Sequence, residues 1–208
     1  MKQNYQKQMD SVVAALPQGT RPRLLLQSCC GPCSSYVLEA LTPYFDVTVL
    51  YYNPNIQPRE EYDLRLENQR KIIAALPTPS AVSVLECSYD GEAYTAAVRG
   101  LESEPEGGKR CTVCFHLRLE ETARQAKEHG FDWFCTTLTV SPHKDAERLN
   151  QIGRALGEKY GVPFLPSDFK KREGYKRSIQ LSKEYDLYRQ DYCGCLYSKR
   201  VDNSASIM

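Results

Sequence analysis

Seven of the nine cysteines in this sequence lie in three short groups, and these groups carry its strongest chemical signal. The first, second and third cysteine groups are Cys29/Cys30/Cys33, Cys111/Cys114 and Cys193/Cys195. A CxxC pair near a helix start places two thiols on one face, with Cβ atoms about 5–6 Å apart, so both can reach one metal. The helix N-terminus lowers thiol pKa values and stabilises an anionic centre. Cys193 and Cys195 flank Gly194, and in an extended segment such alternate residues face the same side. The glycine lets the backbone approach the site closely.

Thiolate-only ligation suits zinc, Cu(I) or an iron–sulfur centre. A [4Fe–4S] cluster takes four cysteines, and a closed structural zinc site also takes four. Either site leaves three of the seven grouped cysteines without a role, so the surplus indicates a second metal or redox-active thiols. The other two cysteines, Cys87 and Cys135, lie singly in apolar segments, where we expect them to pack in the core.

The first cysteine group also permits a different function. Cys30-Gly31-Pro32-Cys33 is the CGPC redox sequence of thioredoxins, and it too stands between an apolar strand and a helix, which is typical of a thiol–disulfide oxidoreductase. Ser28 and Cys29 precede it in place of the usual tryptophan, and further cysteine pairs occur elsewhere in the chain. A zinc-stabilised RNA-binding module without catalytic chemistry is the second alternative.

The segments around the cysteine groups predict alternating strands and helices. We expect strands over residues 23–28, 46–52, 81–87, 132–138 and 162–165. We expect helices over 3–16, 34–41, 59–76, 91–101 and 144–160, and a long helix that carries Cys111 and Cys114 up to Gly130. This alternation indicates an α/β fold with a parallel sheet, in which ligands bind beyond the carboxyl ends of the strands. Cys29 follows the first strand and therefore stands at that edge.

The 208 residues fit a single α/β domain, with the core sheet and helices over 23–165 and a C-terminal extension over 166–208. The extension is basic, carries Cys193 and Cys195, and is expected to close the site. Hydrophobic residues make up 41% and charged residues 25% of the chain, as in soluble globular proteins. No apolar run approaches the roughly 20 residues of a membrane span. The polar first dozen residues lack a signal peptide, which favours a cytoplasmic location, where thiols stay reduced.

Five segments of the chain resemble the cobalamin-independent epoxyqueuosine reductase family, QueH. They read LLLQSCCGPCSSY, YYNPNIQPREEYDLR, RCTVCFHLRLEETA, TTLTVSPHKD and GYKRSIQLSKEYDLYRQDYCGCLYS. The resemblance extends from about Arg23 to Ser198, and the last segment is its most specific part. It implies a Rossmann-like fold similar to the PP-loop and nucleotide α-hydrolase-like proteins. Cysteines replace the glycine-rich pyrophosphate loop after the first strand, so we do not expect ATP binding.

The resemblance implies reduction of epoxyqueuosine to queuosine at the wobble position of tRNAs with GUN anticodons, the last step of queuosine biosynthesis. It also implies a [4Fe–4S] cluster and a neighbouring mononuclear iron, which would account for the surplus of thiolates. We expect a ferredoxin-like or other external electron donor and no membrane partner. We expect the [4Fe–4S] cluster on Cys30, Cys111, Cys114 and Cys193, and the second iron beside Cys29, Cys33 and Cys195.

Proton donors and substrate contacts are expected near the strand ends. The candidate catalytic residues are His143, Asp145 and Tyr192, with Tyr51 as a further proton donor. The candidate substrate-binding residues are Asn53, Arg59, Arg189 and Gln190, together with Lys171, Arg172 and Tyr175 of the basic segment 170–177. Because the net charge is only +1, RNA must be recognised by such a local patch, through phosphate contacts and base stacking. Each residue also has an ordinary structural interpretation, as a turn, a helix cap or a solvated surface.

Overall fold

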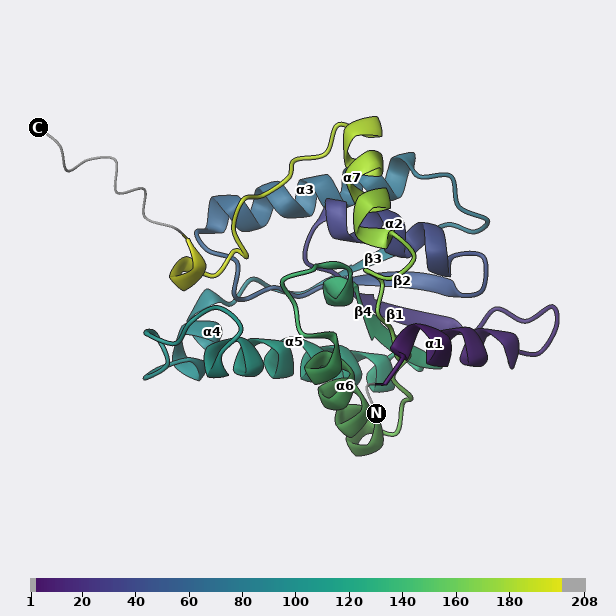
Figure 1. Ribbon diagram of the computed structural model, residues 1–208, viewed down its shortest axis with the longest axis horizontal. Coiled ribbons are helices and arrows are strands. Elements are labelled where there is room, and N and C mark those ends of the chain that lie inside the picture. Colours follow the sequence, from purple (N-terminus) through teal and green to yellow (C-terminus); the bar gives the residue numbers. More distant parts are fainter. Residues whose placement is uncertain (1–2, 200–208) are drawn as a thin grey trace, which may run out of the picture.

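The computed structural model describes residues 3–199, which fold around a sheet of four parallel strands. The strands are β1 (Arg23–Gln27), β2 (Asp46–Tyr51), β3 (Ser83–Glu86) and β4 (Trp133–Thr136), in the spatial order β3-β2-β1-β4. The helices are α1 (Tyr5–Ala14), α2 (Gly31–Leu41), α3 (Arg59–Ala75), α4 (Gly91–Ala97), α5 (Lys109–Glu128), α6 (Ala146–Tyr160) and α7 (Gly174–Glu184), with the 3-10 segments η1 (Thr137–Val140) and η2 (Leu196–Ser198). The sheet lies between two helical layers, with α2, α3 and α7 on one side and α5 and α6 on the other (Figure 1).

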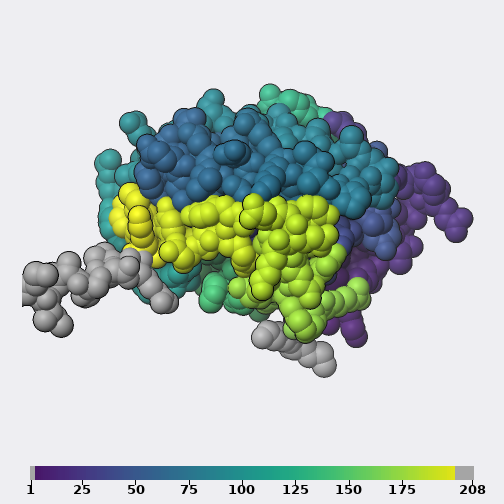
Figure 2. Space-filling view, turned by 90° about the horizontal axis from the view of Figure 1, so that it is seen from above, coloured from purple at the N-terminus to yellow at the C-terminus, as the bar shows by residue number. Residues whose placement is uncertain are grey.

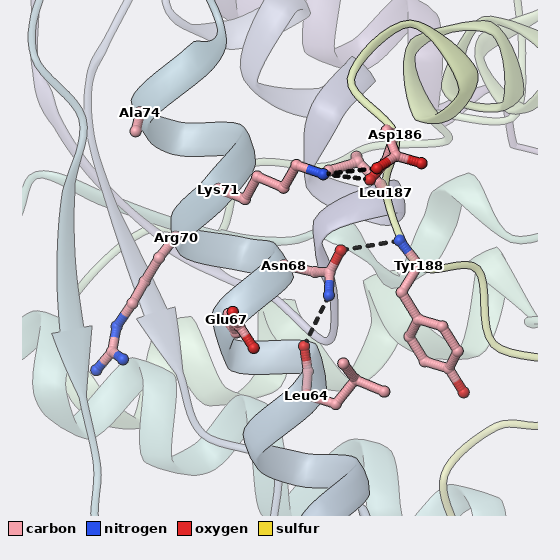
Figure 3. A pocket seen from close by; sticks show the side chains of 9 residues that line it. All are labelled: Leu64, Glu67, Asn68, Arg70, Lys71, Ala74, Asp186, Leu187 and Tyr188. Carbon is pink, nitrogen blue, oxygen red and sulfur yellow. Dashed lines mark hydrogen bonds and ion pairs between the residues drawn. The ribbon is translucent and has the colours of Figure 1, made fainter.

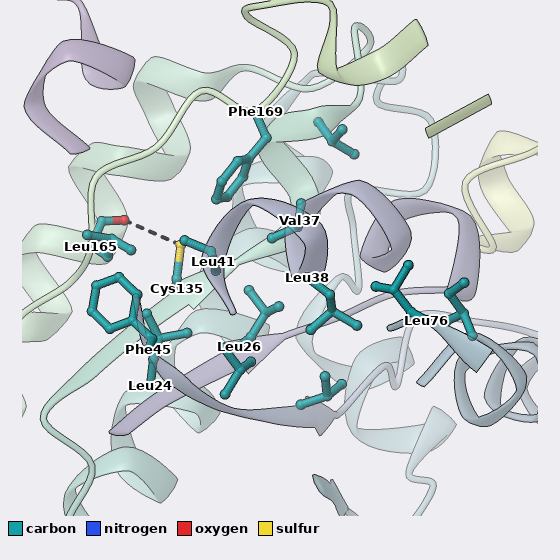
Figure 4. Packing of buried hydrophobic residues seen from close by; sticks show 14 of the residues in the cluster. Leu24, Leu26, Val37, Leu38, Leu41, Phe45, Leu76, Cys135, Leu165 and Phe169 are labelled. Atoms are coloured by element: carbon teal, nitrogen blue, oxygen red, sulfur yellow. Dashed lines mark hydrogen bonds between the residues drawn. The ribbon is translucent and has the colours of Figure 1, made fainter. Parts of the chain in front are cut away.

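The sheet is buried on both faces because successive residues of its central strand point to opposite sides. Leu24 and Leu26 of β1 pack in a hydrophobic cluster with α2, whereas Leu25 between them packs with α5 and α6. In the first cluster, Leu38 and Leu41 of α2 lie over the strand (Figure 4). All five leucines are fully buried, and burial of each such side chain contributes about 1.5–3 kcal/mol.

The order of the strands places a topological switch point between β1 and β4. From β1 the chain runs outward through β2 to β3, and then returns to add β4 on the other side of β1. At the carboxyl ends of these strands Gln27 is in register with Thr136, and Cys29 Sγ lies 3.9 Å from Thr137 Oγ1. Ligands of open α/β sheets bind in the crevice at such a point. The first cysteine group therefore lies where the topology predicts a binding site.

The C-terminal segment returns to the same edge of the sheet. After α7, which packs against α2, residues 186–194 run along α3 toward its N-terminus, as the yellow band in Figure 2 shows. Tyr188 N donates to Asn68 Oδ1 at 2.8 Å in the middle of this run (Figure 3). Gln57 N, just ahead of α3, donates to Gly194 O at 2.9 Å. These contacts bring the third cysteine group to the edge that carries the first.

The parallel α/β fold predicted from the sequence is confirmed, but the expected fifth strand is wrong. Residues 162–165 form only an isolated bridge between Phe134 and Phe164. The strand expected over 132–138 ends at Thr136, because the Thr136 side chain accepts a hydrogen bond from Leu138 N and starts η1. The helix expected from residue 34 begins at Gly31.

The sequence pattern does not predict α7. Its buried residues are Gly174, Ser178, Leu181 and Ser182, so only one aliphatic side chain marks the inward face. The inward face is therefore made mostly of small and polar residues, which do not stand out as a core-facing stripe. Among residues 3–199, no helix is long and apolar enough to cross a membrane. The end of the expected C-terminal extension, residues 200–208, lies outside the described residues.

Candidate metal centre

The first cysteine group is held at the junction of β1 and α2. Cys30 is the N-cap of α2, with extended backbone, and Cys33 lies in the first helical turn. The sulfurs of Cys29, Cys30 and Cys33 all lie within 4.8 Å of one another. All nine cysteines of the chain are free thiols. The positive end of α2 therefore stands beside three converging sulfurs, where it stabilises negative charge.

Gly31 sets this junction through a close contact with α3. A Cβ at this position would lie 2.5 Å from Asn68 O, so any side chain would push the two helices apart. Beside this contact, Ser28 Oγ and Ser34 Oγ each donate to Gln69 Oε1 at 2.7 Å. All three side chains are fully buried, so the hydrogen bonds hold β1, α2 and α3 in one arrangement.

The second cysteine group lies at the start of α5. Cys111 Sγ accepts a hydrogen bond from Gly107 N at 3.2 Å, so the loop before the helix contacts this sulfur directly. Arg110 holds the loop in place, because its Nη1 donates to three of the loop's carbonyl oxygens. Cys114, one turn further on, is buried and packs against Tyr94 of α4.

Gly194 lets the third cysteine group approach the site. Its φ is +99°, in the left-handed region, and a Cβ there would lie 2.9 Å from Ile56 Cγ1. The backbone on its N-terminal side is fixed by Arg65 of α3, whose two terminal nitrogens donate to the carbonyl oxygens of Tyr192 and Cys193, both at 3.2 Å. A helix far away in the sequence therefore positions the two last cysteines.

The two sulfurs of the third group have different partners. Cys193 Sγ accepts a hydrogen bond from Lys144 Nζ at 2.9 Å. Cys195 is buried next to Cys114, and its Sγ lies 3.0 Å from Tyr94 Oη. Cys193 thus faces a cation, whereas Cys195 faces a neutral hydroxyl.

Two buried arginines bring positive charge to the sulfurs. Arg65 and Arg118 are each 1% exposed. Arg118 Nη2 donates to Asn53 Oδ1 at 2.7 Å, its guanidinium lies next to the Cys114 sulfur, and no carboxylate of the described residues pairs with it. Burial lowers the pKa of both guanidiniums, but the neighbouring thiolates, with Glu61 beside Arg65, outweigh it and raise the pKa. A buried cation that faces sulfur indicates a site built for negative charge.

The thiols of the first group titrate unequally. The pKa of Cys29 lies well below its usual value, chiefly because the thiols of Cys30 and Cys33 hydrogen-bond to its sulfur, with Arg118 and Arg65 adding positive charge. The same contact raises the pKa of Cys30 to about 12 and also raises the pKa of Cys33. Without metal, a thiolate in this group is therefore stabilised at Cys29 by hydrogen bonds shared with its two neighbours.

These features fit a thiolate-bound, anionic metal centre. The first group supplies three sulfur donors within reach of one metal, and Cys114 and Cys193 of the other two groups lie near the same buried Arg118 guanidinium, which would offset the charge of an iron–sulfur cluster. In space Cys30 groups with Cys29 and Cys33, whereas the expected division of ligands placed it with the second and third groups.

Known proteins match this chain over most of its length. A model of the family described as epoxyqueuosine reductase QueH matches residues 24–201. The chain belongs to the QueH family. Proteins named epoxyqueuosine reductase QueH from Streptococcus pyogenes serotype M1 and Staphylococcus epidermidis are 44% and 43% identical to it. The alignments cover 96% and 95% of this chain and 80% and 85% of those relatives. The Thermotoga maritima relative is 36% identical, over 84% of this chain and 89% of its own length.

The fold is also similar to a solved structure, the U34-tRNA thiolase NcsA from Methanococcus maripaludis with its [4Fe–4S] cluster. The TM-score is 0.52 at 12% sequence identity, and the match covers 93% of this chain and 68% of that one. At this identity the likeness concerns the fold alone, and it supports the predicted PP-loop-like architecture.

The four expected proton donors of this QueH protein occupy different settings. Tyr51 is fully buried, and its Oη donates to Tyr62 O at 3.0 Å. His143 is exposed, and within the described residues its ring makes no hydrogen bond. Asp145 caps the N-terminus of α6 with its side chain. Tyr192 Oη donates to Gln57 O at 2.8 Å. Lys144, between His143 and Asp145, is the residue of this loop that contacts a cysteine.

Two of the expected substrate-binding residues lie inside the site and two lie outside it. Asn53 is 1% exposed, and its Nδ2 donates to the carbonyl of the residue after β1 at 2.7 Å, so it holds the sheet edge. Gln190 Nε2 donates to Cys30 Sγ at 3.1 Å. Arg59 and Arg189 are exposed, and they contact an aspartate of α3 and a serine of α7.

Most positive charges of the basic segment 170–177 are already paired. Lys171 is exposed without an ion pair among residues 3–199, and Tyr175 is 36% exposed. The four pairs are Lys170–Asp168, Arg172–Asp10, Lys176–Glu173 and Arg177–Glu39.

Sequence reasoning missed Arg65, Arg118 and Lys144. A signal existed for Arg118, because it follows Cys114 by four residues and helical periodicity places both on one face. Arg65 contacts a segment more than a hundred residues away, and no local pattern reveals such a contact.

Proposed function

We propose that this chain is an epoxyqueuosine reductase that removes the epoxide oxygen of epoxyqueuosine in tRNA to give queuosine. The carrying observation is that one cysteine of each group, Cys29, Cys114 and Cys193, lies near the buried guanidinium of Arg118, in a chain of a family whose members are named for this reaction. Dithiol exchange would use only Cys30 and Cys33, and structural zinc would use only four thiolates. Neither alternative needs the buried guanidiniums.

The seven grouped cysteines would hold a [4Fe–4S] cluster and a second, mononuclear iron. Such a cluster supplies electrons one at a time, and an iron supplies a Lewis acid toward the departing oxygen. The chain's own contribution is to fix three separate segments at one sheet edge and to offset their negative charge. Arg118 serves this second purpose, because it lies among the thiolates and is shielded from water, whereas Arg65 is ion-paired with Glu61 at 2.6 Å and chiefly fixes the backbone of the third group.

The reaction takes up two electrons and two protons. Both C–O bonds of the epoxide break, a carbon–carbon double bond forms, and the oxygen leaves as water. We assign proton donation to His143, because its exposed ring is free of hydrogen bonds within the described residues. The side chains of Asp145 and Tyr192 are engaged in a helix cap and a backbone hydrogen bond. A ferredoxin-like or other external donor would supply the electrons.

The substrate would be a tRNA with a GUN anticodon, whose wobble base leaves the stack to reach the sheet edge. Within the basic segment, Lys171 and Tyr175 remain exposed for phosphate and base contacts. The other four cations of the segment are ion-paired, so they attract phosphate less strongly than unpaired cations would. RNA affinity should therefore depend on more of the surface than this segment.

Complementation tests this function in cells. In a bacterium that lacks its own epoxyqueuosine reductase, the wild-type chain should restore queuosine, measured by mass spectrometry of digested tRNA. Cys114→Ala should leave epoxyqueuosine, whereas Cys87→Ser, outside the three groups, should behave as wild type. Persistent epoxyqueuosine with well-expressed wild-type protein would count against the function. Full activity of Cys114→Ala would show that the reaction does not depend on the proposed metal centre.

A further inference from the structure

We propose that Lys144 is a positioning residue of the metal centre, which holds the Cys193 thiolate by a charge-assisted hydrogen bond and makes the centre easier to reduce. Lys144 acts on the proposed metal site, so its role rests on that part of the proposed function and not on the tRNA substrate. Its Nζ lies 2.9 Å from Cys193 Sγ, and its side chain is only 9% exposed. Lysine is rarely buried to this extent without a partner.

Two negative groups face Lys144 from different elements. Cys193 comes from the C-terminal segment, and Glu106, whose Oε1 lies 3.3 Å from Nζ, comes from the loop before α5. The ordinary pKa of a lysine amine is about 10.4, and both neighbours of Nζ can accept hydrogen bonds. The side chain is therefore treated as an ammonium at neutral pH. Because Glu106 is 46% exposed, water screens it more than Cys193.

The partners of three other sulfurs are neutral. Cys30 accepts from the Gln190 amide, Cys111 accepts from a backbone N–H, and Cys195 lies beside the Tyr94 hydroxyl. Lys144 brings a full positive charge to its sulfur in addition to a hydrogen bond. Among these four contacts, the one to Lys144 should therefore change the energy of the centre most.

The expected effect concerns the uptake of one electron. An added electron makes the centre more negative by one charge, and an ammonium at hydrogen-bond distance from a ligand sulfur stabilises that charge. Net charge and hydrogen bonds to sulfur are known to set the potentials of iron–sulfur centres. Removing the ammonium should make the midpoint potential more negative. Removing the charge of Glu106 should make it less negative.

Anaerobic redox titration of the reconstituted full chain tests this role, with visible absorption as the readout and dithionite as the reductant. Lys144→Gln should shift the midpoint potential to a more negative value, and Lys144→Arg should stay near wild type. Glu106→Gln should shift it in the opposite direction, and this half-exposed loop residue is not needed for the core. Lys183→Gln, an exposed lysine of α7, is the matched control and should leave the potential unchanged.

An unchanged potential in Lys144→Gln, at wild-type iron content, would overturn the role of Lys144. Loss of iron from both Lys144 variants would also overturn it, because Arg keeps the charge. If only Lys144→Gln fails to load, the charge is required, and a Glu106→Gln shift to a less negative potential supports the role. A zero or negative shift of the midpoint potential in Glu106→Gln would overturn it.

A wild-type chain that binds no iron would contradict both this role and the proposed function. An iron-loaded chain that is inactive on tRNA would contradict only the proposed function.

Discussion

Arg118 Nη2 donates to Asn53 Oδ1 at 2.7 Å, and this bond links α5 to the carboxyl ends of the central strands. Asn53 Nδ2 donates in turn to Ser28 O at 2.7 Å, immediately before Cys29. All three linked residues are buried. The second cysteine group is therefore connected to the first through two hydrogen bonds that water does not reach.

Replacing Arg118 by methionine should lower the iron content of the reconstituted chain. The thiolates would lose a buried positive charge, and a hydrogen bond from a charged group contributes about 1.5–3 kcal/mol. Iron and sulfide analysis after anaerobic reconstitution measures the effect. Arg124→Met, at an exposed arginine of the same helix, is the control and should load fully. Equal iron in Arg118→Met and wild type would refute the electrostatic role of Arg118.

In the metal-free chain, the rate of alkylation of Cys29 should rise less steeply with pH, from neutral pH to about 9, than that of Cys30. The pKa of Cys29 lies well below the usual value of 9.0, so more of its thiolate is already formed and a rise in pH adds less. Cys30, with a pKa of about 12, should gain about tenfold in reactivity per pH unit over this range. Iodoacetamide labelling with tandem mass spectrometry measures both rates. Parallel rises for the two cysteines would contradict a shared thiolate.

The sequence predicts that the first cysteine group lies at the carboxyl edge of the sheet, and the structure places it there, because the signals are local. Apolar strands end two residues before Cys29 and two residues before Asn53, and parallel strands share one carboxyl edge. The spacing of Cys111 and Cys114 likewise reports on a single helix turn.

Other features depend on contacts that no local pattern carries. The contact of Lys144 with Cys193 depends on the backbone path of one loop, and the neighbouring histidine is the more conspicuous residue in sequence. Arg65 acquires its role only when the C-terminal segment folds along α3. The expected division of the cysteines between a cluster and a second iron stays a prediction, because spacing does not report which sulfurs share a metal.

Substitution of His143 by glutamine should slow epoxyqueuosine reduction by about a hundredfold with no change in iron content, because a general acid is lost. Asp145→Asn should stay near wild type, since asparagine caps a helix as well as aspartate does. Single-turnover conversion of the substrate tRNA measures both variants. A wild-type rate in His143→Gln would show that another residue is the proton donor.

Asn68→Ala should loosen the C-terminal segment that carries the third cysteine group. It removes the hydrogen bond to Tyr188 N at 2.8 Å, which costs about 1 kcal/mol. Hydrogen exchange of the segment 188–195 should accelerate, while the same segment in Glu67→Ala, an exposed neighbour on α3, should exchange as in wild type. Identical exchange in all three proteins would show that other contacts, such as Lys71 with Asp186, hold the segment.

The most direct test of the central claim is the mass of the wobble nucleoside after reaction. Purified chain, reconstituted anaerobically with iron and sulfide, is mixed with tRNA bearing epoxyqueuosine and with dithionite. We predict loss of a single oxygen atom, giving queuosine, and no conversion by the metal-free chain. Unchanged epoxyqueuosine with a chain that holds about four or more irons, or equal conversion without metal, would contradict it.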